Sequence, residues 1–278
     1  MVRSAQVATE LKHHERRPMT RHSLTRQLSI LGLLGIFVLT ALTSVEAGRR
    51  ARRKARRGCC CQNESLPNDW SNQQISKFPA SETPVTLFNG RDLSGWEGHI
   101  DPYWSVQDGV IVARNEKENA PKVSTYLLTN KKYRNFRLVF ESKLVESEMH
   151  SGIALWGKKY DIDGEPFSYQ GHLVMYPSGY GFWDLYRRNS IYRDTEGKAR
   201  AAGRQHEWNQ MEILAIGNRI RHVINGKVVA DWTDPQPELC GTGPLGLQLH
   251  SNGVPQEVHF RGLVVSENPE DTLITVEE

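Results

Sequence analysis

The chain has 278 residues, of which 38% are hydrophobic and 24% charged, a size and composition that fit one or two soluble globular domains. This composition excludes collagen, a coiled coil, a disulfide-dense mini-protein and a polytopic membrane protein. The formal net charge of +3 combines two unlike parts. Residues 1–57 carry 13 basic against 3 acidic residues, whereas residues 58–278 carry 22 against 29. The main part is therefore acidic, and we expect no nucleic-acid partner for it.

Residues 1–47 have the layout of a secretory signal peptide. The segment 28–43 runs for 16 residues without a charge, arginines precede it, and Val45-Glu46-Ala47 follows it as a small-residue cleavage site. The run is slightly shorter than the about 20 apolar residues of a membrane span, which favours a cleaved signal peptide. An uncleaved signal anchor is the alternative. The sequence predicts an exported protein, either periplasmic or associated with the cell envelope.

Residues 48–83 are predicted to be a basic and polar linker. The segment 49–57, RRARRKARR, holds seven like charges in nine residues and is not expected to fold by itself. We expect it to contact an anionic membrane or an envelope polymer. Three adjacent cysteines at 59–61 follow, and Cys240 is the only other cysteine. The spacing is not that of a CxxC metal site; intermolecular disulfides and a bridge to Cys240 both stay open.

Residues 84–268 are predicted to form an all-β domain. About twelve short apolar or alternating runs recur there with turn residues between them, which favours a sandwich or barrel over βαβ units. Asp108-Gly109, Asn225-Gly226 and Asn252-Gly253 are hairpin or tight-turn signals, because these dipeptides accept positive φ. Residues 269–278 form an acidic tail.

Strand alternation predicts which polar side chains share a face. It places three pairs together: Gln170 with His172, Gln248 with His250, and His150 with Trp156. An ordinary solvated sheet face is one interpretation, but such a face usually carries Lys, Glu and Thr. Imidazoles, amides and aromatic rings with small residues between them suit a concave carbohydrate groove. The segments 157–166 and 187–204 are expected to form loops over this groove.

Five blocks of the sequence resemble, in order, the 3-keto-disaccharide hydrolase domain family. They are LFNGRDLSGW (87–96), WSVQDGVI (104–111), HSGIALW (150–156), and the segments 207–231 and 243–265. The resemblance spans roughly residues 84–268. It implies a concanavalin A-like jelly-roll β-sandwich of two antiparallel sheets, and an exported enzyme that acts on an oxidised saccharide.

The resemblance also implies a reaction, the cleavage of 3-keto-glycosides. A ketone at C3 acidifies the hydrogen at C2, a base removes it, the glycosidic oxygen leaves C1, and water then adds. The candidate catalytic residues are Glu141, His150 and His172, which are expected together on the concave face that forms the groove. The candidate saccharide-binding residues are Trp156, Tyr169, Gln170, Trp183, Gln248 and His250. No cofactor and no metal-ligand spacing is evident, although a divalent cation held by ligands that only the fold assembles stays open.

The chain departs from the family pattern at its expected pocket. Gln170-Gly171-His172 stands where members often carry Glu-x-Gln, His150 and Trp156 replace the usual Asn and Arg, and Gly262 replaces another Asn. A carboxylate and a cation have thus become neutral or aromatic side chains. The alternative function is therefore a non-catalytic carbohydrate-binding module of the same fold, held at the cell envelope, with a plain saccharide as its ligand.

Overall fold

A computed structural model of the protein describes residues 69–277 apart from residues 148, 178–180 and 186–188. The hydrophobic run 28–43, the basic segment 49–57 and the cysteines at 59–61 lie outside the described residues. Within the described part, no helix is both long enough and apolar enough to cross a membrane.

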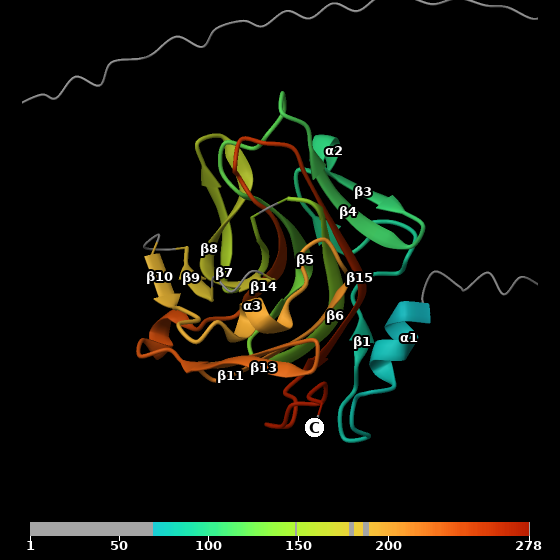
Figure 1. Ribbon diagram of the computed structural model, residues 1–278, viewed down its shortest axis with the longest axis vertical. Helices are drawn as coiled ribbons and strands as arrows, with labels where there is room; N and C mark the ends of the chain where they lie inside the picture. Colours follow the sequence, from blue (N-terminus) through green and yellow to red (C-terminus); the bar gives the residue numbers. More distant parts are fainter. Residues whose placement is uncertain (1–68, 148, 178–180, 186–188, 278) are drawn as a thin grey trace, which may run out of the picture. The chain divides into compact units, whose positions relative to one another are not determined.

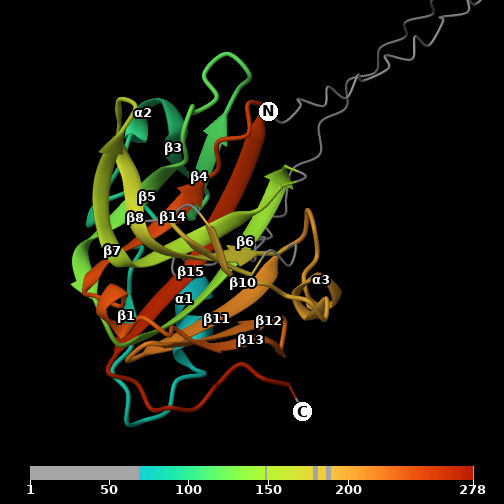
Figure 2. The same ribbon diagram turned by 90° about the vertical axis from the view of Figure 1, so that its left-hand side faces the viewer.

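The described residues form two antiparallel β-sheets packed into a sandwich (Figures 1 and 2), which confirms the predicted jelly-roll fold class. The eight-stranded sheet contains β1 (Val85–Thr86), β3 (Trp104–Gln107), β4 (Val110–Asn115), β6 (Phe136–Glu146), β11 (Asn209–Ile216), β12 (Arg219–Ile224), β13 (Lys227–Thr233) and β15 (Gln256–Glu267). Its order is β13-β12-β11-β6-β15-β4-β3, with β1 paired to β15.

The second sheet has seven strands, in the order β10-β9-β8-β7-β14-β5-β2. They are β2 (Trp96–Glu97), β5 (Thr125–Tyr133), β7 (Ser151–Ile162), β8 (Glu165–Tyr176), β9 (Phe182–Asp184), β10 (Asn189–Tyr192) and β14 (Gly243–Leu249). The helices are short: α1 (Asp69–Ile75), α2 (Ile100–Tyr103), α3 (Lys198–Ala202) and the 3-10 helix η1 (Pro237–Leu239).

Alternating side chains of both sheets build the core between them. Phe136 and Phe140 of β6 and Leu247 and Leu249 of β14 belong to one buried hydrophobic cluster. Because successive residues of a strand point to opposite faces, the residues between them turn to the outer faces. A smaller buried cluster lies on the outer face of the seven-stranded sheet and contains Tyr126, Leu128, Ala154, Tyr169, Leu173, Met175 and Leu185.

Two of the predicted hairpin turns are confirmed. Asp108 and Gly109 have φ of 49° and 76°, and Asn225 and Gly226 have φ of 48° and 78°, the left-handed conformation that a two-residue hairpin requires. The expectation of a loop over 157–166 is wrong, because most of this segment continues β7 and β8. These strands turn at Asp163-Gly164, with φ of 53° and 82°, so this Asp-Gly pair forms a further two-residue hairpin turn.

The last residues assigned to the linker fold onto the sandwich. Residues 69–75 form α1, which packs beside β15 (Figure 1). The guanidinium of Arg261 on β15 lies 4.7 Å from the ring centre of Trp70 and 3.8 Å from that of Trp208. A cation held between two aromatic rings stabilises such a contact, so α1 is anchored to the eight-stranded sheet.

A buried ion cluster connects both ends of the described chain to the eight-stranded sheet. Arg137 of β6 and Glu212 of β11 are fully buried and form an ion pair. Arg137 also contacts the Glu82 carboxylate at 2.7 Å and donates to the carbonyl oxygen of Thr272 at 2.6 Å. The Glu212 carboxylate accepts the backbone N–H of Thr275 at 2.9 Å. Part of the acidic tail is therefore packed on the domain.

Replacing Arg137 with Met should lower the free energy of unfolding by about 3–5 kcal/mol, because two carboxylates would stay buried without their cation. Urea unfolding of the full chain measures this. The control is Arg219→Ala, which removes an exposed pair with Asp231 at 2.6 Å and should cost less than about 1 kcal/mol. Similar small losses in both variants would contradict a structural role for the cluster.

Candidate functional site

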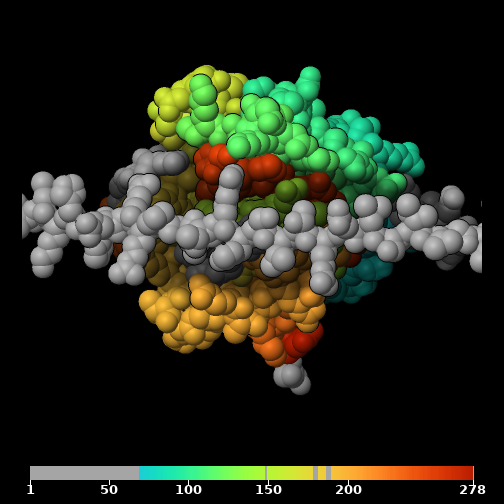
Figure 3. All heavy atoms as spheres, turned by 45° about the horizontal axis from the view of Figure 1, so that its top comes forward, coloured from blue at the N-terminus to red at the C-terminus, as the bar shows by residue number. Residues whose placement is uncertain are grey.

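A pocket of about 570 Å³ opens on the outer face of the seven-stranded sheet, a size typical of small-ligand sites. Its described lining residues are Ser124, His150, Leu173, Met175, Trp183, Leu185, Ser190, Arg193, Asp194, Thr195, Gln248 and His250. The space-filling view in Figure 3 shows a recess in the surface, with green segments above it and the amber segment that contains α3 below it.

Two glycines lie among the side chains on the outer face of the seven-stranded sheet. A Cβ atom on Gly246 would lie 2.9 Å from a methyl group of Leu128, and one on Gly152 would lie 2.6 Å from a methyl group of Leu173. Both distances are too short for real carbon contacts. Gly152 and Gly246 therefore let Leu173 and Leu128 lie close to the sheet, and Leu173 lines the pocket.

Two histidines meet at one end of the pocket. His150 directly precedes β7 and His250 directly follows β14, and the register that pairs Ile153 with Leu247 places the histidines opposite each other. Their ring centres are 4.5 Å apart at an interplanar angle of 73°. Burial, with a smaller contribution from His250, lowers the pKa of His150 to about 3. His150 is thus a neutral imidazole near pH 7, with one N–H donor and one acceptor nitrogen.

Gln248 is a buried amide at the wall of the pocket. It is 2% exposed, and its Nε2 lies 3.3 Å from the Tyr126 hydroxyl and 3.4 Å from the Ser124 hydroxyl. Its Oε1 has no hydrogen-bond partner within the described residues. A buried carbonyl without a donor is costly, so this oxygen is suited to accept a hydrogen bond from a ligand hydroxyl.

The segment between β10 and α3 adds charged side chains to the lining of the pocket. Arg193 is the only permanently cationic side chain among the described lining residues. Asp194 is the only carboxylate in that set, and its oxygens accept the backbone N–H groups of Lys198 at 2.9 Å and Ala199 at 2.7 Å. Asp194 therefore fixes the start of α3. Part of the segment 187–204 thus lines the pocket, although no sequence pattern singles out Arg193.

The predicted site residues separate into two groups. The pocket brings together His150, Trp183, Gln248 and His250. Glu141 lies elsewhere, so its predicted placement with the histidines is wrong: it belongs to β6 of the other sheet, where its carboxylate accepts from Arg261 Nε at 2.6 Å. Alternation assigns a residue to one side of its strand, but it does not say to which sheet the strand belongs.

His172 and Trp156 point into the core instead of the pocket, which corrects their predicted placement. A β-bulge shifts the register of β7 against β8 between Leu155 and Lys158, and Trp156 has a φ of 57°. The Trp156 indole is therefore turned inward, where its Nε1 donates to the Arg134 carbonyl oxygen at 2.7 Å. His172 is 1% exposed and its ring centre lies 5.4 Å from that of Trp156.

Glycines make this bulge possible. A Cβ atom on Gly157 would lie 1.8 Å from the Gln170 carbonyl oxygen, and one on Gly243 would lie 1.9 Å from the Gly157 carbonyl oxygen. Tyr169 closes the same region, because its hydroxyl accepts from Gly157 N at 2.9 Å and donates to the Pro244 carbonyl oxygen at 2.8 Å. Gln170 and Tyr169 are therefore structural neighbours of the bulge and are not among the described lining residues of the pocket.

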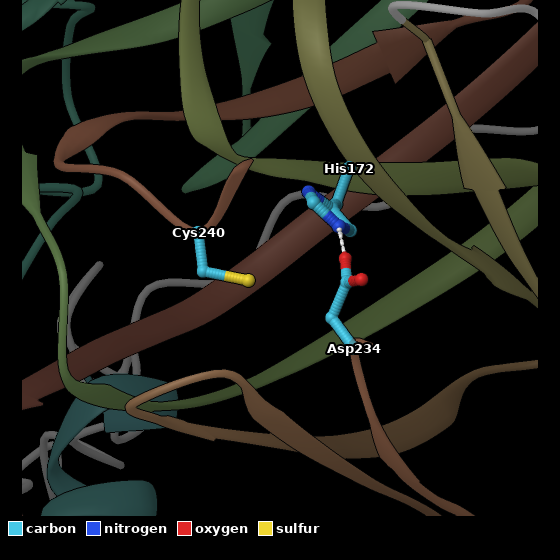
Figure 4. A group of neighbouring side chains, drawn as sticks. All are labelled: His172, Asp234 and Cys240. Atoms are coloured by element: carbon cyan, nitrogen blue, oxygen red, sulfur yellow. Dashed lines mark hydrogen bonds and ion pairs between the residues drawn. The ribbon is translucent and has the colours of Figure 1, made fainter. Parts of the chain in front are cut away.

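A second polar cluster lies in the interior, on the core side of β8 (Figure 4). His172 Nε2 and Asp234 Oδ2 are 2.5 Å apart, and the thiol of Cys240 points toward them. All three residues are buried, and burial, reinforced by the Asp234 carboxylate, raises the pKa of the Cys240 thiol to about 12. One ligand atom from each residue lies within 4.8 Å of the others.

Acidification should destabilise the fold through its buried histidines. The pKa values of His150 and His222 fall from 6.5 to about 3 on folding, so the unfolded chain binds more protons between these pH values. The free energy of unfolding should therefore decrease as pH falls from 6.5 toward 3, by up to about 1.4 kcal/mol per pH unit for each histidine. Urea unfolding of the wild type and of His222→Leu across this pH range measures how much of the pH dependence comes from His222. A variant curve parallel to that of the wild type would contradict the prediction.

The sequence matches the model of a known protein family. The model of the family described as 3-keto-alpha-glucoside-1,2-lyase-like domain matches residues 83–266. No curated protein matches the chain. Two candidate glycosyl hydrolases from Parabacteroides distasonis are 22% and 19% identical, with TM-scores of 0.46 and 0.47; each alignment covers 66% of this chain, and 93% and 98% of theirs.

A carbohydrate-binding module, CBM66 from Bacillus subtilis, is 10% identical with a TM-score of 0.43, over 64% of this chain and 98% of its own. Because the family match covers residues 83–266 of 278, it spans more than half of the sequence and confirms the resemblance found in the five sequence blocks. The chain belongs to the 3-keto-alpha-glucoside-1,2-lyase-like domain family.

Proposed function

We propose that the protein is an exported enzyme that cleaves 3-keto-glycosides in the pocket on the seven-stranded sheet. The observation that carries this proposal is the convergence of His150, His250, Gln248 and Arg193 on one recess with Trp183. Family membership supports a glycan-related function. Export rests on the segment 28–43, and contact of the segment 49–57 with an anionic envelope surface belongs to the same proposal.

The reaction is an elimination followed by a hydration. A base takes the proton from C2, which the C3 ketone has made acidic, and the electron pair of the C2–H bond passes through the enolate. The C1–O bond then breaks, and the glycosidic oxygen leaves with a proton. Water adds its hydroxyl to C1 and a proton to C2, so the sum is hydrolysis. The site must supply a base, and donors or a cation for the enolate oxygen.

The pocket residues fit these roles. In this proposal His250, which is half-buried at the pocket, is the base. His150 is neutral because its pKa is about 3, and its N–H donates to the enolate oxygen. The Arg193 guanidinium opposes the negative charge that develops there. Gln248 binds a sugar hydroxyl, and the Trp183 ring covers a sugar face.

The carboxylate content of the pocket favours elimination over ordinary glycoside hydrolysis. A typical glycosidase needs two carboxyl groups that flank the bond to be broken. Asp194 is the only carboxylate among the described lining residues, and it caps α3. The two histidines are therefore better placed than any described carboxylate to handle protons in this pocket.

The test is cleavage of 3-keto-trehalose, 3-keto-lactose and 3-keto-sucrose by the full chain, followed through the free sugar released. His250→Ala and His150→Ala should each lower kcat at least about 100-fold, the usual size of a general acid–base contribution. The matched control is His259→Ala, since His259 lies on the eight-stranded sheet beside Glu257; its kcat should change less than about twofold. Cleavage that depends on Glu141 or His172 and not on the pocket histidines would contradict the assignment.

The second candidate function is a non-catalytic carbohydrate-binding module. The apolar character of the wall, with Leu173, Met175, Trp183 and Leu185, favours it, because aromatic and aliphatic surfaces bind sugar faces without chemistry. Binding of unoxidised glycans by the wild type, without cleavage of any 3-keto-sugar, would support this function over the enzyme.

Gln248→Ala should weaken saccharide binding under either function, by about 5- to 20-fold, because one buried hydrogen bond to a hydroxyl is lost. Isothermal titration with the best-bound sugar measures the change. The control is Gln107→Ala, an exposed amide on β3. An unchanged Kd in Gln248→Ala would show that the sugar does not contact this wall of the pocket.

A further inference from the structure

The cluster of His172, Asp234 and Cys240 takes no part in the proposed reaction. His172 comes from β8 in the seven-stranded sheet, Asp234 directly follows β13 of the eight-stranded sheet, and Cys240 directly follows η1. Their exposed fractions are 1%, 3% and 1%. A group bound to all three residues would connect the two sheets from inside the sandwich (Figure 4).

The donor set is that of a zinc site. One ligand atom from each residue lies within 4.8 Å of the others, whereas the bond lengths of a tetrahedral zinc site set ligand atoms about 3.5 Å apart. Zinc binding would therefore move His172 Nε2 and Asp234 Oδ2 apart from their present 2.5 Å and draw Cys240 closer. An imidazole and a carboxylate are ordinary zinc ligands, and a sulfur donor favours zinc over magnesium or calcium. The set of one His, one Asp and one Cys leaves a fourth coordination position.

The two nitrogens of His172 differ in their surroundings. His172 Nε2 bonds to Asp234 Oδ2 at 2.5 Å, whereas His172 Nδ1 is buried and has no hydrogen-bond partner among the described residues. An ion bound by all three residues would therefore be bound by Nε2, the nitrogen that faces Asp234. The neutral ring would then carry its proton on Nδ1, where no described donor opposes it.

The surroundings of the cluster suit a buried ion. Thiolate and carboxylate together carry two negative charges, which balance Zn²⁺, so the loaded site buries no net charge. Asp234 is held by the Gln236 N–H, which donates to its Oδ1 at 2.8 Å, and the Cys240 carbonyl oxygen accepts from Arg134 at 2.8 Å. The Trp232 ring centre lies 6.1 Å from that of His172, and this aromatic surface restricts access of water.

We infer that His172, Asp234 and Cys240 form a zinc site that joins the two sheets of the sandwich. On binding, the S–H bond of Cys240 breaks, its proton goes to solvent, and a Zn–S bond forms without any change of oxidation state. The proton between His172 Nε2 and Asp234 Oδ2 moves to His172 Nδ1, so that Nε2 and the carboxylate bind zinc as a neutral imidazole and an anion. The zinc site is independent of the proposed saccharide chemistry, because the pocket and this cluster lie on opposite sides of β8.

The experiment uses the full chain with Cys59, Cys60 and Cys61 changed to Ser, because these cysteines could bind metal themselves. Cys240 is then the only cysteine left. We expect this variant to bind one Zn²⁺ and to gain thermal stability when it does. With Co²⁺ it should show the thiolate-to-cobalt charge-transfer band, which can arise only from Cys240.

Adding Cys240→Ser to this variant should abolish the cobalt band and weaken Zn²⁺ binding at least about 100-fold, since even the loss of an outer-shell partner costs 10- to 100-fold. Asp234→Asn should also weaken binding. Failure of the triple-Ser variant to bind Zn²⁺, or binding without the cobalt band, would overturn the inference whether or not the Cys240→Ser variant folds. An unchanged Zn²⁺ affinity after Cys240→Ser would overturn it as well.

Discussion

The alternation of side chains along β7, β8 and β14 determines which residues face the core and which face the pocket. Each strand presents one row to the core and the other to the outer face, so Leu247 and Leu249 fill the core while Gln248 faces the pocket. A bulge after Leu155 interrupts this alternation. It turns Trp156 inward, beside His172, which already faces the core on β8 together with Val174.

Burial gives the two sides of the sheet different chemistry. On the outer side, it keeps His150 neutral with a pKa of about 3, so this ring offers a ligand one N–H donor and one acceptor nitrogen. On the inner side, burial raises the pKa of the Cys240 thiol to about 12, so this thiol is no nucleophile and acts as a ligand only if a cation replaces its proton. The same sheet therefore supports a proposed reaction site and a proposed structural metal site.

Much of the fold could be predicted from the sequence, because its signals are local. The Asp-Gly and Asn-Gly turns require positive φ, and the placement of Gln248 and His250 on one face follows from the two-residue period of their strand. The pocket residues His150 and Trp183 are also among the residues that the sequence singles out. These positions lie in or beside regular strands, where pattern and structure agree.

The rest depends on contacts between residues far apart in the chain. The sheet to which β6 belongs is set by its pairing with β11 and β15, so the sequence alone could not show that Glu141 lies away from the pocket. The bulge at Trp156 depends on the close approach of Gly157, Gly171 and Gly243. His172 and Asp234 are 62 residues apart, and no short sequence motif predicts that they are in contact.

Cleavage by elimination and hydration in this pocket is tested most directly by deuterium incorporation. The full chain would be incubated with 3-keto-trehalose in D₂O, and the released 3-keto-glucose examined by NMR against a sample without protein. We predict one solvent deuterium at C2 of the product, introduced at the rate of cleavage. Cleavage that leaves the original hydrogen at C2 would contradict elimination and indicate direct displacement at C1.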